Sequence, residues 1–155
     1  MLYLTSWSKH HALMRKGIPE ARSGRAFTIM AKPRKVFGEI GDGFCSALVP
    51  RGPEVELMQE LVRLRRLDVD DPELYQKYRS LMIDRIKREG RIAPGVLRAG
   101  DDLVRDGDTL CCACAAPDAL AGKCHRHWCA RLLVEAGWDV EQDGRRISKE
   151  FLMCA

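Results

Sequence analysis

Residues 108–135 read DTLCCACAAPDALAGKCHRHWCARLLVE, and this stretch decides how the chain is expected to fold. Its first part, 108–115, is small and apolar on both alternating faces, which predicts a central strand covered on both sides. A loop rich in Ala, Pro and Gly follows over 116–123. Cys124 then opens a predicted helix that runs to about Glu135 and ends before Gly137. A strand, loop and helix in this order are typical of an α/β domain.

The segments on either side of this unit alternate between strand and helix patterns. Residues 2–7 predict a first strand because they are aromatic and rich in strand-forming side chains. Apolar residues recur at helical spacing over 54–66 and again from Pro72 to Gly90, where Asp71 is expected to cap the second helix. Weaker patterns predict a strand over 26–30, a long loop over 36–53, a short helix after Pro94, a polar turn over 100–107 and a last strand over 138–140.

These elements predict a single α/β domain over residues 1–143, with a C-terminal tail over 144–155. We expect three layers, in which helices flank a small, mostly parallel central sheet. The chain has 155 residues, of which 46% are hydrophobic and 31% charged, and this composition argues against disorder. No apolar run approaches the roughly 18 residues of a membrane span, and the first residues lack the pattern of an export signal. We therefore expect a cytoplasmic protein that does not bind membranes.

Charge is distributed unevenly along the chain. Residues 1–35 contain eight Lys or Arg side chains and one acid, Glu20, although the whole chain has a net charge of only +4. A first third this basic indicates either an anionic partner, such as a nucleotide or nucleic acid, or a solvated basic surface.

Five of the seven cysteines lie between positions 111 and 129. Their odd number and the lack of an export signal argue against a disulfide scaffold. Cys112 and Cys114 are expected to point to the same face of the strand. Cys124 is expected at a helix N-terminus, where N–H groups and the helix dipole stabilise a thiolate or a bound phosphate.

Three interpretations of this cluster remain open. In the first, Cys124 is a reactive thiolate or an anchor for an anion, assisted by His125 and Arg126. In the second, zinc is bound by Cys112, Cys114, Cys124 and either His127 or Cys129, although Cys-x-Cys is not the usual spacing of zinc ligands. In the third, the cysteines at 111, 112, 114 and 129 are small buried hydrophobic residues without chemistry.

The same pattern resembles a known family. Leu110, Cys112 and Cys114, followed by Cys-His-Arg at 124–126, are similar to the bacterial family called domain of unknown function 488 and its Cys-His relatives. Residues 4–7, the Arg22 and Arg25 pair and the Leu-Val-Pro-Arg-Gly segment at 48–52 extend the resemblance to about residues 1–140. The loop before Cys124 is longer than the family pattern, and Cys111 and Cys129 are not part of it. The resemblance implies an α/β fold with a cleft at these elements, and it implies no established reaction.

The sequence therefore predicts an α/β protein that binds a phosphate-bearing ligand, either a nucleotide or nucleic acid, where the strand, loop and helix meet. Arginine suits this role because its planar guanidinium holds phosphate oxygens in pairs. The catalytic candidates are Cys124 as nucleophile and His125 as proton carrier, and whether the protein is an enzyme stays open. The expected ligand-binding residues are Thr5, Ser6, Arg22, Arg25, Arg51, Cys114 and Arg126. The alternative is a zinc-stabilised module that binds nucleic acid or protein without catalysis.

Overall fold

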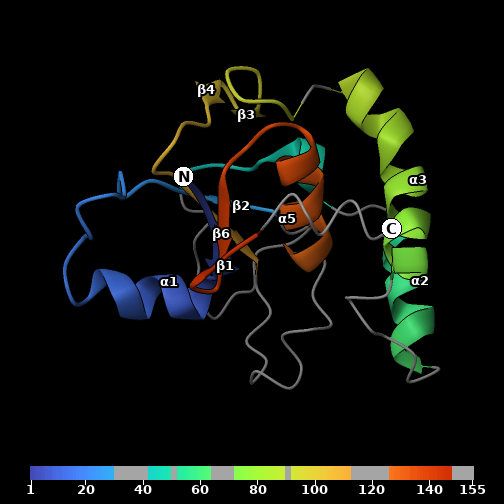
Figure 1. Cartoon of the computed structure of the whole chain (residues 1–155), viewed down its shortest axis with the longest axis horizontal. Coiled ribbons are helices and arrows are strands. Elements are labelled where there is room, and N and C mark those ends of the chain that lie inside the picture. Colours follow the sequence, from blue (N-terminus) through green and yellow to red (C-terminus); the bar gives the residue numbers. More distant parts are fainter. Residues whose placement is uncertain (30–41, 50–51, 64–71, 90–91, 113–125, 148–155) are drawn as a thin grey trace.

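The computed structural model describes residues 1–29, 42–49, 52–63, 72–89, 92–112 and 126–147 (Figure 1). At its centre is a five-stranded sheet with the order β2-β5-β1-β6-β7. The strands are β1 (Leu2–Ser6), β2 (Ala26–Thr28), β5 (Thr109–Cys112), β6 (Val140–Gln142) and β7 (Arg145–Arg146). The pairs formed by β1, β2, β5 and β6 are parallel, whereas β7 pairs antiparallel with β6. The predicted α/β class with a mostly parallel sheet is therefore confirmed.

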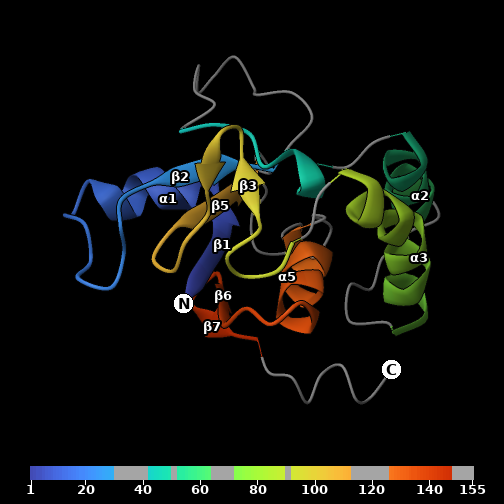
Figure 2. The same ribbon diagram turned by 90° about the horizontal axis from the view of Figure 1, so that it is seen from above.

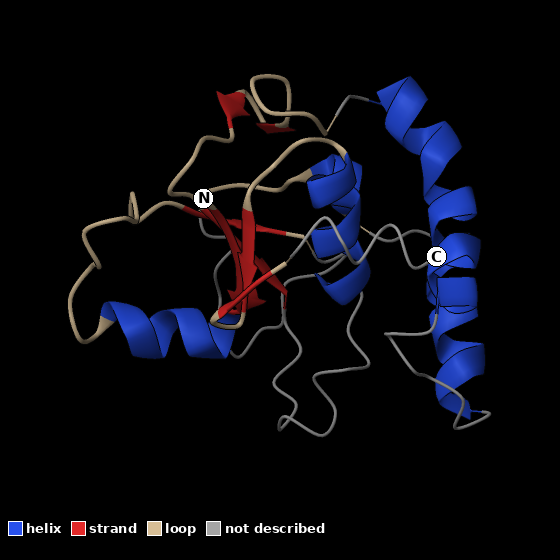
Figure 3. Cartoon of the chain, in the orientation of Figure 1, coloured by secondary structure: helices blue, strands red, loops and turns tan. Residues whose placement is uncertain are grey.

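Helices cover both faces of this sheet, as Figure 3 shows by secondary structure. α1 (Trp7–Met14) lies on one face and α5 (Arg126–Glu135) on the other (Figures 1 and 2). α2 (Gly52–Arg63) and α3 (Pro72–Glu89) form an outer pair on the far side of α5, and they confirm the two helices predicted there. Within the described ranges, no helix has both the length and the apolar character required to cross a membrane.

The chain leaves the two central strands in opposite directions. From β1 the chain passes through α1 to β2, which lies on the far side of β5. From β5 it passes through α5 to β6, which lies on the far side of β1. Right-handed crossovers in opposite directions require helices on opposite faces, as observed. The carboxyl ends of β1 and β5 therefore form a topological switch point, the position where open α/β sheets bind ligands.

Alternation along the strands divides the buried side chains between the two faces. Leu4 and Cys112 belong to the main hydrophobic core under α5, whereas Cys111 packs with Trp7 of α1 and Ala26 in a smaller cluster. Burial raises the pKa of the Cys111 thiol well above its usual value. Cys111 is therefore a packing residue of the sheet, as one of the three interpretations predicted for it.

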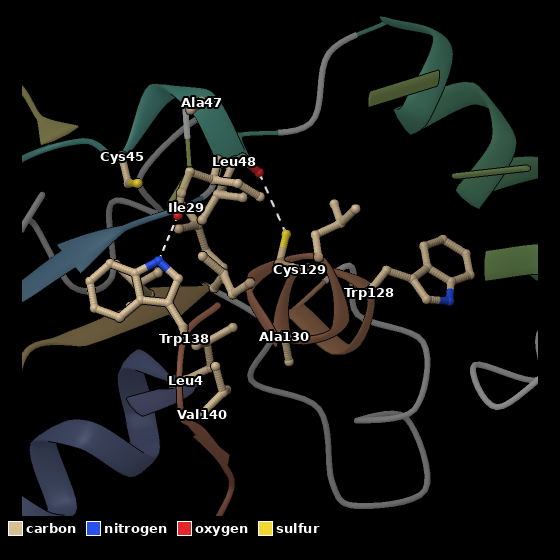
Figure 4. Packing of buried hydrophobic residues seen from close by; sticks show 14 of the residues in the cluster. Leu4, Ile29, Cys45, Ala47, Leu48, Trp128, Cys129, Ala130, Trp138 and Val140 are labelled. Carbon is tan, nitrogen blue, oxygen red and sulfur yellow. Dashed lines mark hydrogen bonds between the residues drawn. The ribbon is translucent and has the colours of Figure 1, made fainter. Parts of the chain in front are cut away.

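α5 is the central helix of the core, and it is buried on nearly every side (Figure 4). The sheet covers one side of it, and α3 covers the other, where the Trp128 and Tyr78 rings lie 4.6 Å apart. The Cys129 thiol donates a hydrogen bond to the carbonyl of Leu48, 3.7 Å away, in the 3-10 helix η1 (Ser46–Leu48). After Glu135 the helix closes as predicted near Gly137, with the Trp138 amide donating to the Leu133 carbonyl.

Three short segments differ from the sequence-based prediction. α1 lies in a segment for which no element is predicted from the sequence, and its first turn is held by the Ser6 hydroxyl, which accepts a hydrogen bond from the Lys9 amide at 3.2 Å. The residues after Pro94 form a turn instead of a short helix. The predicted polar turn over 100–107 contains most of a small hairpin, β3 (Arg98–Ala99) and β4 (Asp102–Leu103).

The sheet also extends beyond residue 143. Asp143 and Gly144 have φ angles of +49° and +85°, and they form the two-residue turn of the β6–β7 hairpin. Ile147 packs against the main core after this hairpin. The domain boundary predicted at residue 143 therefore falls inside the sheet, because the Asp-Gly turn returns the chain to pair with β6.

Candidate functional site

Polar side chains from three elements meet at the carboxyl edge of the sheet, around the switch point. β1 ends at Ser6, the described part of β5 ends at Cys112, and β6 ends just before Asp143. Arg126, the first described residue of α5, lies beside them. Residues that are far apart in the sequence share this edge because parallel strands all end on the same side.

The carboxylate of Asp143 links β1, α1 and α5. Its Oδ1 accepts a hydrogen bond from Thr5 Oγ1 at 2.9 Å and lies 3.6 Å from the Lys9 ammonium. Its Oδ2 accepts a hydrogen bond from Arg126 Nε at 3.0 Å. Since Arg126 is only 1% exposed, its charge needs a partner of this kind. Asp143 therefore holds the start of α5 against the end of β1.

The guanidinium of Arg126 also reaches β5. Its Nη1 donates a hydrogen bond to the sulfur of Cys112 at 3.0 Å, on the α5 face of the sheet. The next residue, His127, is hydrogen-bonded through Nδ1 to Nε2 of Gln142 on β6. The Arg126 guanidinium therefore bridges the carboxylate of Asp143 and the buried thiol of Cys112 at the start of α5.

A cavity of about 190 Å³ lies on the α1 side of this edge. Its wall is formed by Leu4, Thr5, Lys9, His10, Leu13, Arg22, Glu141, Asp143 and Gly144. Nδ1 of His10 and Nη1 of Arg22 expose almost no surface to the cavity or to solvent, and they have no hydrogen-bond partner among the residues described. The guanidinium of Arg22 lies 4.0 Å from the centre of the Tyr3 ring, a cation–π contact that holds it in place.

His10 is an uncharged group of this wall at neutral pH. The side chain is 5% exposed, and this burial lowers its pKa below the usual value of 6.5. The neighbouring His11 and Arg22 lower the pKa of His10 further, whereas Asp42 raises it. A neutral imidazole has one donor and one acceptor nitrogen, so His10 can make one hydrogen bond of either kind through Nδ1.

Arg25 lies at the opposite edge of the sheet. It donates hydrogen bonds from Nε and Nη2 to the buried carboxylate of Asp108, just before β5 begins. β5 rises by roughly 3.3 Å per residue, so about 13 Å separates Asp108 from Cys112 along the strand. Burial alone would raise the pKa of Asp108, but hydrogen bonds from Arg25, Ser23 and the Arg105 amide lower it below its usual value. Arg25 thus anchors the segment that carries Arg22.

The structure brings together some of the predicted ligand-binding residues and separates others. Thr5 and Arg22 line the cavity, and Arg126 binds the carboxylate at its wall, whereas Arg25 lies at the other edge. The Ser6 hydroxyl caps α1. Four predicted site residues lie outside the described residues, and their roles stay predictions: Arg51, Cys114, Cys124 and His125.

Four polar residues of the cavity wall were missed by the sequence analysis, namely Lys9, His10, Glu141 and Asp143. Lys9 and His10 lie on α1, whose start is signalled only by Ser6 as an N-cap residue. The apolar pattern of α1 is interrupted by two histidines, so periodicity alone does not reveal it. Asp143 stands in an Asp-Gly pair, a strong sequence signal for a two-residue hairpin turn. That signal could have located Asp143 next to the last parallel strand.

The zinc interpretation is only partly covered by the described residues. Within them, no group of three or more His, Cys, Asp or Glu side chains is arranged to hold a metal ion. Cys112 contacts Arg126 and His127 contacts Gln142. Two members of the predicted ligand set, Cys114 and Cys124, lie outside the described ranges, so this set stays a prediction.

Comparison with protein families, curated proteins and solved structures finds no match to this chain. The resemblance to domain of unknown function 488 therefore stays a prediction that rests on the residues quoted for it.

Proposed function

We propose that this chain binds a phosphate-bearing ligand, a nucleotide or nucleic acid, in the cavity between α1 and the sheet. The observation that carries the proposal is the position of this cavity, at the carboxyl edge of the sheet beside the switch point, with the side chains of Lys9 and Arg22 in its wall. Both side chains are cations that pair with phosphate oxygens.

Two of the charged side chains in the wall are suited to bind an anion. Lys9 and Arg22 are cations, and Glu141 and Asp143 contribute two carboxylates to the same wall. Asp143 is paired with the buried guanidinium of Arg126 at 3.0 Å. The support for an anion therefore comes from the Lys9 and Arg22 side chains and not from an excess of positive charge.

Binding of inorganic phosphate tests the proposal directly. Titration of the protein with inorganic phosphate at low ionic strength, followed by calorimetry, is expected to show saturable binding that Arg22→Met removes. Arg15→Met is the matched control, since Arg15 is an exposed residue at the end of α1 that does not line the cavity. It removes the same charge and should leave binding nearly unchanged. Absence of binding, or equal binding by the wild type and Arg22→Met, would refute the proposal.

Thiol chemistry at Cys124, assisted by His125, is a second part of the proposal. It is supported by Arg126 at the start of α5, whose buried guanidinium pairs with Asp143 and donates a hydrogen bond to the sulfur of Cys112 at 3.0 Å. Profiling with an alkylating reagent is expected to label Cys124 fastest, and Cys124→Ser should remove that fast phase. A Cys124 that reacts no faster than free cysteine would rule out an activated thiol at this position.

A further inference from the structure

We propose that residues 148–155 of this chain, which lie outside the described residues, dock in an apolar groove between α3 and α5. The groove lies on the α5 side of the sheet, whereas the cavity of the proposed function lies on the α1 side. The two proposals concern different surfaces, so the failure of one leaves the other intact. The inference is carried by the chemistry of the groove, by the position of Ile147 and by the sequence that follows it.

The groove between α3 and α5 is lined mainly by aliphatic side chains. Its volume is about 210 Å³, and its apolar lining residues are Ile83, Ile86, Ile92, Leu132 and Ala136. An apolar cavity of roughly 150 Å³ is large enough to bind benzene, so this groove has room for an aromatic ring. Ile86 and Ala136 also pack against the main hydrophobic core. An occupant of the groove would therefore extend that core between the two helices.

The two charged residues of the groove are paired with each other. Arg79 donates a hydrogen bond from Nε to Oε1 of Glu135 at 2.8 Å, and the Tyr75 hydroxyl donates to Oε2 of the same carboxylate at 3.0 Å. Because this ion pair is closed, the groove offers no net charge to an occupant. It therefore favours an apolar segment without net charge.

The described part of the chain ends close to this groove. The Ile147 amide donates a hydrogen bond to the Val140 carbonyl at 2.9 Å, and the Ile147 side chain packs against the main core. Opposed residues of antiparallel strands lie about 5.5 Å apart. Val140 follows Ala136 of the groove by four residues, so their Cα atoms are at most about 15 Å apart. Ile147 is therefore within about 20 Å of the groove.

The residues that follow Ile147 match the groove in length and in character. Residues 148–155 read SKEFLMCA, with one Lys, one Glu and a run of apolar side chains that begins at Phe151. Eight extended residues span roughly 26–29 Å, more than the greatest separation of Ile147 from the groove. The charges of Lys149 and Glu150 cancel, in agreement with the neutral groove. We assign Phe151 to the groove because it is the largest apolar side chain of this segment.

The variant Phe151→Trp reports on docking through quenching of its fluorescence by iodide. The natural residues Trp7, Trp128 and Trp138 are at most 4% exposed, so iodide should quench them weakly. Burial of one aromatic side chain shifts an equilibrium by at least about tenfold. We therefore expect the added tryptophan to be quenched about tenfold less than free tryptophan.

Two further substitutions in the Phe151→Trp variant locate the docking site. Ile83→Asp places a charge in the groove, so it should release the segment and restore quenching to the level of free tryptophan. The matched control is Leu81→Asp, because Leu81 is 40% exposed on the same helix and does not line the groove. This control should leave the tryptophan shielded.

Three outcomes of the quenching experiment would overturn the inference. The first is quenching of Phe151→Trp at the level of free tryptophan, and the second is shielding that Ile83→Asp leaves unchanged. The third is shielding that increases with protein concentration, because a second copy of the chain would then supply the segment.

Thermal unfolding decides the question if Ile83→Asp does not fold. Phe151→Ser should lower the midpoint of the wild type by about 4 °C, since it removes the apolar side chain from the groove. Lys149→Ser is the control within the same segment and should leave the midpoint unchanged. Equal midpoints for the wild type and Phe151→Ser would overturn the inference.

Discussion

Replacing Asp108 by Asn should destabilise the protein by about 3 kcal/mol. Oδ1 accepts hydrogen bonds from Ser23 Oγ at 2.6 Å and Arg25 Nε at 3.1 Å, and Oδ2 accepts from Arg25 Nη2 at 2.6 Å and the Arg105 amide at 2.8 Å. The amide nitrogen of Asn would replace one oxygen and face two of these donors. Ser23 can turn its hydroxyl round, so the least costly arrangement loses one charge-assisted bond, worth about 1.5–3 kcal/mol. Loss of the negative charge opposite Arg25 adds to this cost. This added cost is small because Arg25 is 34% exposed and solvent screens the ion pair.

Urea unfolding followed by circular dichroism at pH 7 measures this loss. The matched control is Asp139→Asn, whose carboxylate is 50% exposed and pairs with the 71% exposed Arg146, so we expect a loss of under about 1 kcal/mol. A loss for Asp108→Asn no larger than that of the control would refute the reasoning. Arg22 lies on the segment that Asp108 anchors through Arg25, so affinity for inorganic phosphate should fall in the same variant.

The effect of Asp108→Asn should also depend on pH. The pKa of Asp108 is lower in the folded protein than its usual value of 3.8, so the ionised carboxylate stabilises the folded state above that value. This contribution is lost as the pH falls through the lowered pKa of Asp108. The difference between wild type and variant should therefore shrink in acid, and a difference that stays constant would contradict the assigned charge state.

Three further predictions use the same unfolding measurement. Gly107→Ala should lower the free energy of unfolding by about 2 kcal/mol more than Gly95→Ala. Both glycines have φ near +90°, but only at Gly107 would the new Cβ lie within 3.2 Å of a backbone atom, the amide nitrogen of Ser23. Equal losses of stability for the two variants would contradict this. Arg126→Met should lower the free energy of unfolding by about 3 kcal/mol because it leaves Asp143 without its buried partner. For the exposed Arg146→Met the expected loss is under about 1 kcal/mol. Because burial lowers the pKa of His10, the free energy of unfolding should decrease as the pH falls below 6.5, and His10→Gln should flatten that slope.

Local patterns in the sequence were sufficient for most of the architecture. The small-residue strand β5, the helix that ends before Gly137 and the two helices α2 and α3 follow from periodicity and capping residues. α1 was missed because its periodicity is weak, and β7 because its two arginines carry no strand pattern. In both cases the relevant signal was a single residue or pair, Ser6 as a cap and Asp143-Gly144 as a hairpin turn.

The candidate site was predictable only in part. Thr5, Arg22 and Arg126 were expected to bind a ligand because of their residue types and positions. Which of them has a free hydrogen-bonding atom depends on partners that lie far away in the sequence. Thr5 and Arg126 both bind Asp143, whereas Arg22 keeps one buried nitrogen without a partner among the described residues.

The sequence by itself determined the α/β class, the order of the main helices and strands, and the strand and helix that bring a cysteine and an arginine to the carboxyl edge of the sheet. These features depend on residues that are close together in the sequence, within one or two helical turns or a few strand positions, so the spacing of apolar residues is sufficient to predict them. Only the tertiary structure separated the arginines by role, since Arg25 pairs with Asp108 at one edge and Arg22 lines a cavity near the other. Identical guanidinium groups differ in function according to the charges and acceptors that the fold places around them, and these contacts join residues with no regular spacing in the chain.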